Sequence, residues 1–178
     1  MNDFSGGAGE VASEILLNQE DILVVTPELV VELKRRALAS PRRRARLCMH
    51  HSTGHLTQEM LIVFHRDSSM PPHRHPQGKS ESYHLLEGCL RVFLFTDDGR
   101  VFRVLDLEAG KSFLYRLAAP HWHMPVPLSE WVVYHEVYTG PFVKTADVEF
   151  APWAPPETSS AEAAEYLALL LAKHADSE

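Results

Sequence analysis

The residues best suited to chemistry lie between Pro71 and Gly88, in the segment PPHRHPQGKSESYHLLEG. His73 and His75 are two positions apart, so in an extended strand both imidazoles leave the same side of the backbone. A short loop follows, and Glu81 then begins a strand that ends at the glycine. Imidazole nitrogen together with carboxylate oxygen is a ligand mixture that borderline divalent metals prefer. The segment therefore predicts a metal site.

The spacing of this segment resembles a known family. Two histidines around one residue, then a loop, a glutamate and, after six residues, a glycine are similar to the first motif of the cupins, with one extra residue in the loop. Within the cupins the chain resembles the WbuC-type cupin-fold metalloproteins, from Leu16 to Val143. The likeness is carried by SPRRRARLCMHHS at 40–52, PHRHPQGKSESYHLLEG at 72–88, the pair Trp122–His123, and the E-x-x-x-G-P motif of Glu136, Gly140 and Pro141.

This resemblance implies an all-β fold, a single cupin barrel (double-stranded β-helix, jelly-roll) with an N-terminal and a C-terminal helix. We expect a disordered N-terminus at 1–14, the barrel with its N-terminal helix at 15–150, and a Pro-rich connector with the C-terminal helix at 151–178. The resemblance also implies one divalent transition metal ion at the centre of the barrel. The ligand types admit Fe²⁺, Ni²⁺, Mn²⁺ or Zn²⁺.

A fourth metal ligand is expected from the stretch AAPHWHM. His123 stands where the second cupin motif has its histidine, although Ala118, Pro120 and Pro127 replace the usual proline, glycine and asparagine around it. His121 shares the strand parity of His123, so it is the alternative ligand. We place His73, His75, Glu81 and His123 in the ligand set, which leaves one or two positions open on an octahedral ion. Open positions are typical of a catalytic site.

The resemblance assigns two further residues to the pocket around the metal, Arg46 and His50. Arg46 would pair with a substrate carboxylate or phosphate, since a guanidinium binds such groups through two parallel hydrogen bonds. His50 would transfer a proton near neutral pH. The alternative for Arg46 is a solvated cation, because it belongs to a basic stretch that also holds Arg42, Arg43 and Arg44.

Strand parity points three more side chains toward the pocket, each with a simpler alternative. Gln58 and Tyr83 are predicted to contact the substrate, and Glu136 to act as a general base or as a partner of a liganding imidazole. If the parity is reversed, Gln58 and Glu136 face solvent, and Tyr83 only fills the barrel.

Length and composition agree with one soluble domain. The chain has 178 residues, 45% of them apolar and 23% charged, and a net charge of −7 that argues against nucleic-acid binding. Its apolar runs are too short to span a membrane, and the start MNDFSGGAGE is unlike a signal peptide, so we expect a cytoplasmic protein. A homodimer is expected because cupins often pair through their sheets.

Periodicity predicts the elements that position these residues. DILVV at 21–25 predicts a short strand, and Thr26-Pro27-Glu28 begins a helix that ends at Ser40-Pro41. Ser159 and Glu162 predict a capping box for a helix over 163–174. The remaining strands are expected from Leu56 onward and at 90–95, 100–107, 112–117 and 131–138, the second and third joined by a TDDG turn.

Together these features predict a metal-dependent enzyme acting on a small anionic metabolite, by oxygenase, decarboxylase or sugar-related isomerase chemistry. The WbuC-type likeness links such a protein to surface-polysaccharide metabolism. The alternative is a non-catalytic sensor or accessory domain that binds a small molecule or a metal, because cupins host enzymes and pure binders alike.

Overall fold

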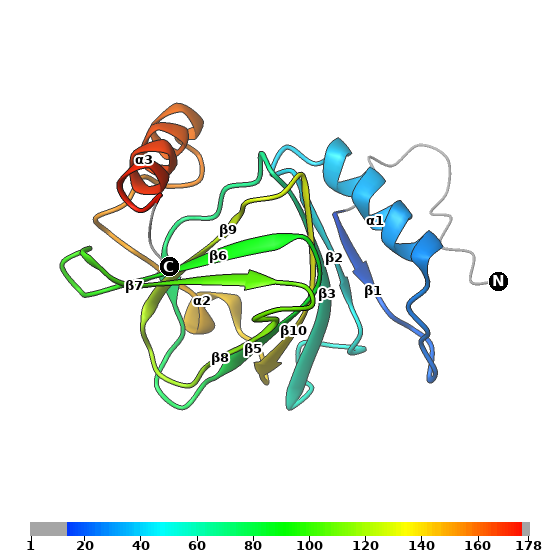
Figure 1. Cartoon of the computed structure of the whole chain (residues 1–178). Helices are drawn as coiled ribbons and strands as arrows, with labels where there is room; N and C mark the ends of the chain where they lie inside the picture. The colour runs from blue at the N-terminus through cyan, green and yellow to red at the C-terminus, as the bar shows by residue number, and fades with distance from the viewer. Residues whose placement is uncertain (1–13, 176–178) are drawn as a thin grey trace.

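A computed structural model describes residues 14–175 and contains two β-sheets that face each other (Figure 1). The six-stranded first sheet has the order β1-β2-β3-β10-β5-β8, and the five-stranded second sheet has the order β11-β4-β9-β6-β7. The first sheet consists of β1 (Ile15–Leu17), β2 (Arg44–Cys48), β3 (Thr57–His65), β10 (Trp131–Thr139), β5 (Glu81–Glu87) and β8 (Leu114–Leu117). The second consists of β11 (Glu149–Phe150), β4 (His73–Arg74), β9 (Trp122–Pro127), β6 (Cys89–Phe95) and β7 (Val101–Glu108).

Neighbouring strands pair antiparallel, except for β1 and β2, which pair parallel. Consecutive strands repeatedly cross from one sheet to the other, which gives a jelly-roll arrangement. The chain therefore forms the two-layered all-β barrel that the sequence predicts.

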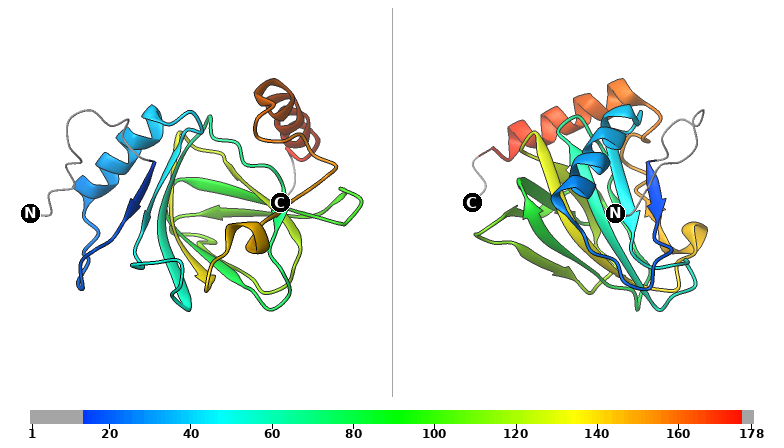
Figure 2. Two further views of the ribbon diagram at one scale, coloured as in Figure 1. Left: turned by 180° about the vertical axis from the view of Figure 1, so that it is seen from behind. Right: turned by 90° about the vertical axis from the view of Figure 1, so that its right-hand side faces the viewer.

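Two helices cover the outer faces of the two sheets (Figures 1 and 2). Helix α1 (Pro27–Ala39) packs its apolar face, including Leu33 and Ala37, onto the outer side of β2 and β3. Helix α3 (Ser160–Lys173) lies on the second sheet, where Leu170 packs among the aromatic side chains of β6 and β9. Because both helices lie on outer faces, the strand side chains between the sheets can form an interior site. A short helix, α2 (Lys144–Asp147), follows β10.

Strand β3 shows how the sequence selects the inner face of the first sheet. Leu61 and Val63 pack against α1, whereas Gln58, Met60 and Ile62 point into the barrel. This alternation follows from the period of two of a β-strand. A slip of one residue would place the polar amide under the helix and the leucine in the barrel, so the apolar pattern fixes the register.

Gly88 turns the chain from β5 into β6 and is required for steric reasons. Its φ of +83° lies in the left-handed region, and a Cβ there would come within 2.1 Å of the carbonyl oxygen of Trp131. Only glycine tolerates both conditions at once. Gly88, the last residue of the first motif, therefore fixes where β5, the strand that begins at Glu81, ends.

Several local predictions need correction, and others lie outside the described residues. Residues 21–25 form no strand; Leu23 and Val25 instead pack against the α1 cluster, and the first strand is β1. Ser159 precedes α3, but its side chain makes no capping hydrogen bond, because the backbone there is not extended (φ −93°, ψ 69°). The predicted disorder of 1–14 falls almost wholly outside the described residues.

The helix predicted after Thr26 is confirmed: the hydroxyl of this residue accepts a hydrogen bond from Leu29 N–H, and α1 ends at Ala39. The TDDG turn is also confirmed between β6 and β7. Among residues 14–175, no helix is long and apolar enough to cross a membrane.

Candidate metal centre

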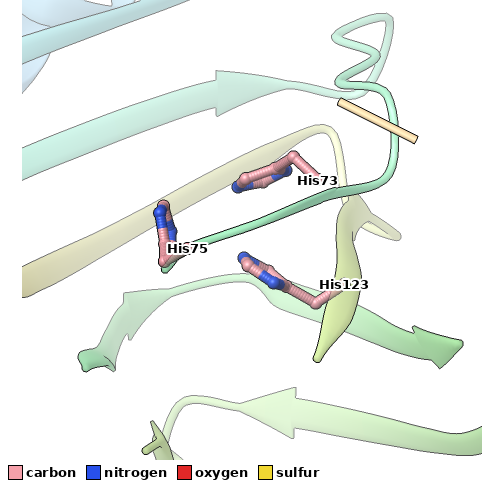
Figure 3. Close-up of side chains that lie close together, drawn as sticks. All are labelled: His73, His75 and His123. Atoms are coloured by element: carbon pink, nitrogen blue, oxygen red, sulfur yellow. The ribbon is translucent and has the colours of Figure 1, made fainter. Parts of the chain in front are cut away.

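Three imidazoles converge inside the barrel from two neighbouring strands of the second sheet (Figure 3). His73 lies on β4, directly opposite His123 on β9, and His75 follows β4 immediately. One ring nitrogen from each of the three side chains lies within 4.8 Å of the other two. Residues separated by about 50 positions in the chain are thus brought together by strand pairing.

Each of the three rings is held by a backbone carbonyl, and this determines which nitrogen faces the centre. A carbonyl oxygen only accepts hydrogen bonds, so each Nδ1 carries a hydrogen and each Nε2 is the nitrogen that faces the centre. Histidines that bind metals usually donate their other ring N–H to a carbonyl or carboxylate in this way. The contacts are His73 Nδ1 to Pro71 O at 3.2 Å, His75 Nδ1 to Asp147 O at 2.7 Å, and His123 Nδ1 to His121 O at 3.1 Å.

Glu81, the first residue of β5, brings a carboxylate to the same point from the other sheet. Its Oε1 lies 2.8 Å from His123 Nε2, and its Oε2 lies 3.2 Å from His75 Nε2. Apart from this contact with each other, neither Glu81 Oε1 nor His123 Nε2 has a hydrogen-bond partner within the described residues, although both are buried. Two ligands each about 2.1 Å from one ion and at right angles to each other are about 3 Å apart. The donor set therefore fits a divalent transition metal.

Electrostatics support the same interpretation. Burial alone would raise the pKa of Glu81, but the facing imidazoles of His123 and His75 hold that pKa well below its ordinary value. Burial, followed by the charge of His123, lowers the pKa of His73 far below its usual range. Glu81 and His73 thus have the protonation states that a metal ligand requires. For His75, burial is outweighed by the hydrogen bond and charge of Glu81, which raise its pKa, so metal binding there would displace a proton.

Tyr83 lies two residues after Glu81 and orients its carboxylate. The phenol is buried and donates a hydrogen bond of 2.9 Å to Glu81 Oε2. Burial and the neighbouring carboxylates raise the pKa of Tyr83 well above its ordinary value, so the hydroxyl remains a donor. In the structure the Tyr83 hydroxyl contacts a predicted metal ligand, and the substrate contact predicted for this residue stays a prediction.

A cavity of about 460 Å³ extends from the histidines toward β2. Eight of the nine predicted site residues line it; the ninth, His123, is fully buried behind Glu81. The alternative ligand His121 is exposed on the outside, against Phe102, and only its carbonyl contributes to the site. The lining residues from the predicted set are Arg46, His50, Gln58, His73, His75, Glu81, Tyr83 and Glu136.

The arginines of the basic stretch differ in their pairing. Arg42 pairs with Glu14, and Arg44 pairs with Glu157 at 2.5 Å. Arg46, in contrast, forms no ion pair within residues 14–175, and its buried Nε lacks a hydrogen-bond partner. It is thus a guanidinium in the cavity wall whose hydrogen-bonding capacity is partly unused, which is the condition for binding an anion.

Glu136, on β10, faces the cavity beside Met60 on β3 and Tyr83 on β5. Its partial exposure is therefore to the cavity rather than to the outer surface. Burial, and next the charge of Glu81, raise the pKa of Glu136 to about 8. Its carboxyl group is mostly protonated at neutral pH in this structure and can give or take a proton near neutrality.

The two remaining predicted residues, His50 and Gln58, also line the cavity. His50 Nδ1 lies 3.1 Å from both the N–H and the carbonyl of Glu59, which fixes its ring, and burial lowers the pKa of His50. Gln58 is 2% exposed, and its side-chain nitrogen donates to the carbonyls of Thr53 and His55 at 3.2 and 2.8 Å. Its nitrogen therefore holds a loop, and the predicted substrate contact remains a prediction.

Some contributors carry no signal in the sequence. The Asp147 carbonyl that orients His75 belongs to α2, and Glu157, which pairs with Arg44, comes from the Pro-rich connector. Phe142 adds an apolar surface to the cavity. Only the folded chain brings these segments to the barrel, because their contacts span tens of residues.

Comparisons with known proteins identify the fold. Residues 25–107, less than half of the chain, match a family described as "Domain of unknown function (DUF6016)". A search of curated proteins found no match. A variant of oxalate decarboxylase from Bacillus subtilis is 20% identical with a TM-score of 0.41, over 48% of this chain and 22% of that one.

Two solved structures are more similar over the length of the chain. Protein SO0799 from Shewanella oneidensis has a TM-score of 0.52 and 11% identity, over 70% of this chain and 82% of that chain. Oxalate oxidase, solved in complex with the substrate analogue glycolate, has a TM-score of 0.50 and 16% identity, over 78% of this chain and 76% of that chain. Together with the two-sheet topology, these likenesses show that the chain has the cupin fold.

Proposed function

We propose that this protein is a metal-dependent enzyme that acts on a small anionic metabolite. One observation carries the proposal: three imidazole Nε2 atoms and the Glu81 carboxylate meet at a cavity that also holds the guanidinium of Arg46, which forms no ion pair within residues 14–175. A structural site is usually closed by its ligands, whereas this one borders a cavity. The oxygenase, decarboxylase and isomerase reactions predicted from the sequence all need such an accessible site.

His73, His75, Glu81 and His123 would hold the metal, as Fe²⁺, Ni²⁺, Mn²⁺ or Zn²⁺. When bound, such an ion supplies Lewis acidity and orients an oxygen-bearing substrate. Tyr83 acts as a positioning residue, because it fixes the Glu81 carboxylate through a hydrogen bond of 2.9 Å.

The protein groups around this site have distinct parts in the proposal. Arg46 binds the anionic group of the substrate. Glu136 and His50 move protons, since both line the cavity and each has a pKa shifted by burial. A carboxyl and an imidazole that titrate in different ranges can serve as separate acid and base.

The finer assignments from the sequence belong to the same proposal. They are membership of the WbuC-type proteins, a sugar-related substrate linked to surface polysaccharides, a homodimer, and a cytoplasmic location. The cupin fold and the guanidinium in the cavity wall support the first two.

Elemental analysis of the purified protein, followed by a substrate panel on the metal-loaded form, tests the function. We expect about one transition metal ion per chain, and loss of that ion in His73→Ala. Full metal content in this variant would refute the site. Arg46→Ala should raise KM for acidic substrates, whereas Arg103→Ala, an exposed change on β7, should not. Metal binding without turnover of any oxo acid, diol or sugar phosphate would favour a sensor instead.

A further inference from the structure

The cavity is larger than an anion such as oxalate would require. Its volume of about 460 Å³ falls within the range of about 300–1,000 Å³ in which proteins bind drug-sized ligands. The histidines and Glu81 occupy one end, and Arg46 lies in the wall on a different strand. A ligand that contacts both the metal site and the guanidinium therefore has to cross the cavity.

Strand order gives the separation of the two ends. Glu81 lies on β5 and Arg46 on β2, with β10 and β3 between them in the same sheet. Adjacent strands are about 4.8 Å apart, so the two backbones are separated by about 14 Å along the curved sheet. Both side chains reach inward and shorten the gap, but two whole strands still intervene.

Two strands lie between these ends: β3 presents the apolar side chains of Met60 and Ile62, whereas β10 presents Tyr134, Glu136 and Tyr138. Ile62 on β3 is directly opposite Arg46, and Met60 is directly opposite Cys48, the next inward residue of β2. Phe142 and Met70 pack against the same cluster from outside the sheet. A polar or heavily hydroxylated segment lying here would lose water without gaining hydrogen bonds from these side chains, whereas methylene groups would be stabilised by burial.

We propose that this cavity binds an elongated anion with two polar ends joined by an apolar segment. One end meets the metal site, the other end carries an anionic group held by Arg46, and the segment between them lies on Met60 and Ile62. This inference rests on the proposed function, because it takes the metal site as the place where one end binds. It specifies the class of ligand as an acid with an apolar spacer between its two ends, rather than a compact diacid.

The test uses the full chain reconstituted with Co²⁺, whose visible absorption changes when a ligand binds to the ion. Two series of probes share a 2-oxo carboxylate head: linear 2-oxo monocarboxylates, and 2-oxo dicarboxylates of the same chain lengths. We expect Kd to fall about fourfold for each added methylene, up to an optimum length, because each buried methylene contributes to affinity. Near the optimum, the dicarboxylate should bind at least tenfold more tightly than the monocarboxylate, since a hydrogen bond to a charged group is a strong one.

Two variants separate the two parts of the proposal. Arg46→Met should abolish the tighter binding of the dicarboxylates and keep the gain in affinity per methylene. Met60→Gln, similar in size but polar, should reduce the gain per methylene and keep the dicarboxylate advantage, whereas Met60→Leu should retain both. Arg103→Met on the exposed side of β7 is the matched control. Co²⁺ content and thermal unfolding identify any variant that fails to fold, and the wild-type series then decides.

The results distinguish this inference from the proposed function. Equal affinity for all chain lengths in Co²⁺-loaded wild-type protein would overturn the inference, and so would equal affinity for mono- and dicarboxylates, while the metal site would stand. A protein that takes up no Co²⁺ would overturn both. A rise in affinity with length that Arg46→Met leaves unchanged would also overturn it, because the far end would then have another partner.

Discussion

Replacement of Glu136 by glutamine should stabilise the metal-free protein in a strongly pH-dependent way. The carboxyl group faces the cavity, and its pKa is raised from 4.5 to about 8 by burial and by the charge of Glu81. Glutamine has nearly the same shape and no charge. The substitution therefore removes the cost of ionising a buried acid and changes little else.

The sign and size follow from the shift in pKa. Below pH 4.5 the folded and unfolded chains both keep the proton of Glu136, so ionisation of this carboxyl group costs no folding stability there. Between pH 4.5 and 8 the unfolded chain releases the proton and the folded chain keeps it, so stability falls as pH rises. At about 1.4 kcal/mol per unit, the complete loss would be about 5 kcal/mol. Water in the cavity screens the charge, so we expect about 2–3 kcal/mol.

The assay is urea unfolding of chelator-treated protein at pH 4.5 and pH 8.5. Glu136→Gln should match the wild type at the lower pH and exceed its free energy of unfolding by about 2–3 kcal/mol at the higher pH. Glu165→Gln, an exposed change on α3, serves as the control and should leave stability unchanged at both. No gain in the free energy of unfolding of Glu136→Gln at pH 8.5, or the same gain at both pH values, would refute the predicted cost of ionisation. A divalent cation beside Glu81 should shrink the gain, because it offsets the charge that helps to raise the pKa.

Further substitutions test individual contacts. His123→Ala should abolish metal binding in elemental analysis while His121→Ala retains at least half of it, and the reverse pattern would contradict the ligand assignment. Tyr83→Phe should weaken metal affinity by about 10–100-fold in competition with a chelator, because the carboxylate loses its orienting hydrogen bond; an unchanged affinity would show that this phenol only fills space. Gly88→Ala should lower the free energy of unfolding by about 3 kcal/mol or more, since a Cβ would clash with a backbone carbonyl; a loss below 1 kcal/mol in chemical denaturation would rule out that clash.

Local sequence patterns were sufficient for much of the barrel. The alternation in β3 separated Met60 and Ile62 from Leu61 and Val63, because only one arrangement puts leucine and valine under α1. A hydroxyl followed by proline marked the start of that helix at Thr26. Periodicity misled at 21–25, where alternate side chains pack beneath α1 and no neighbouring strand completes a ladder. A β-rich run becomes a strand only when another strand offers it hydrogen bonds.

For the site, the sequence by itself determined which residue types were available and which of them share a strand face. These two facts identified the motif of His73, His75 and Glu81. The sequence left His121 and His123 open, because parity is the same for both; the pairing of β4 with β9 places His123 opposite His73 and leaves its neighbour outside. Tertiary structure alone decided that Arg46 lines the cavity while Arg42 and Arg44 form ion pairs, and which nitrogen each imidazole turns inward. Both depend on partners distant in the chain, such as Glu157 and the carbonyl of Asp147, and no local pattern encodes such contacts.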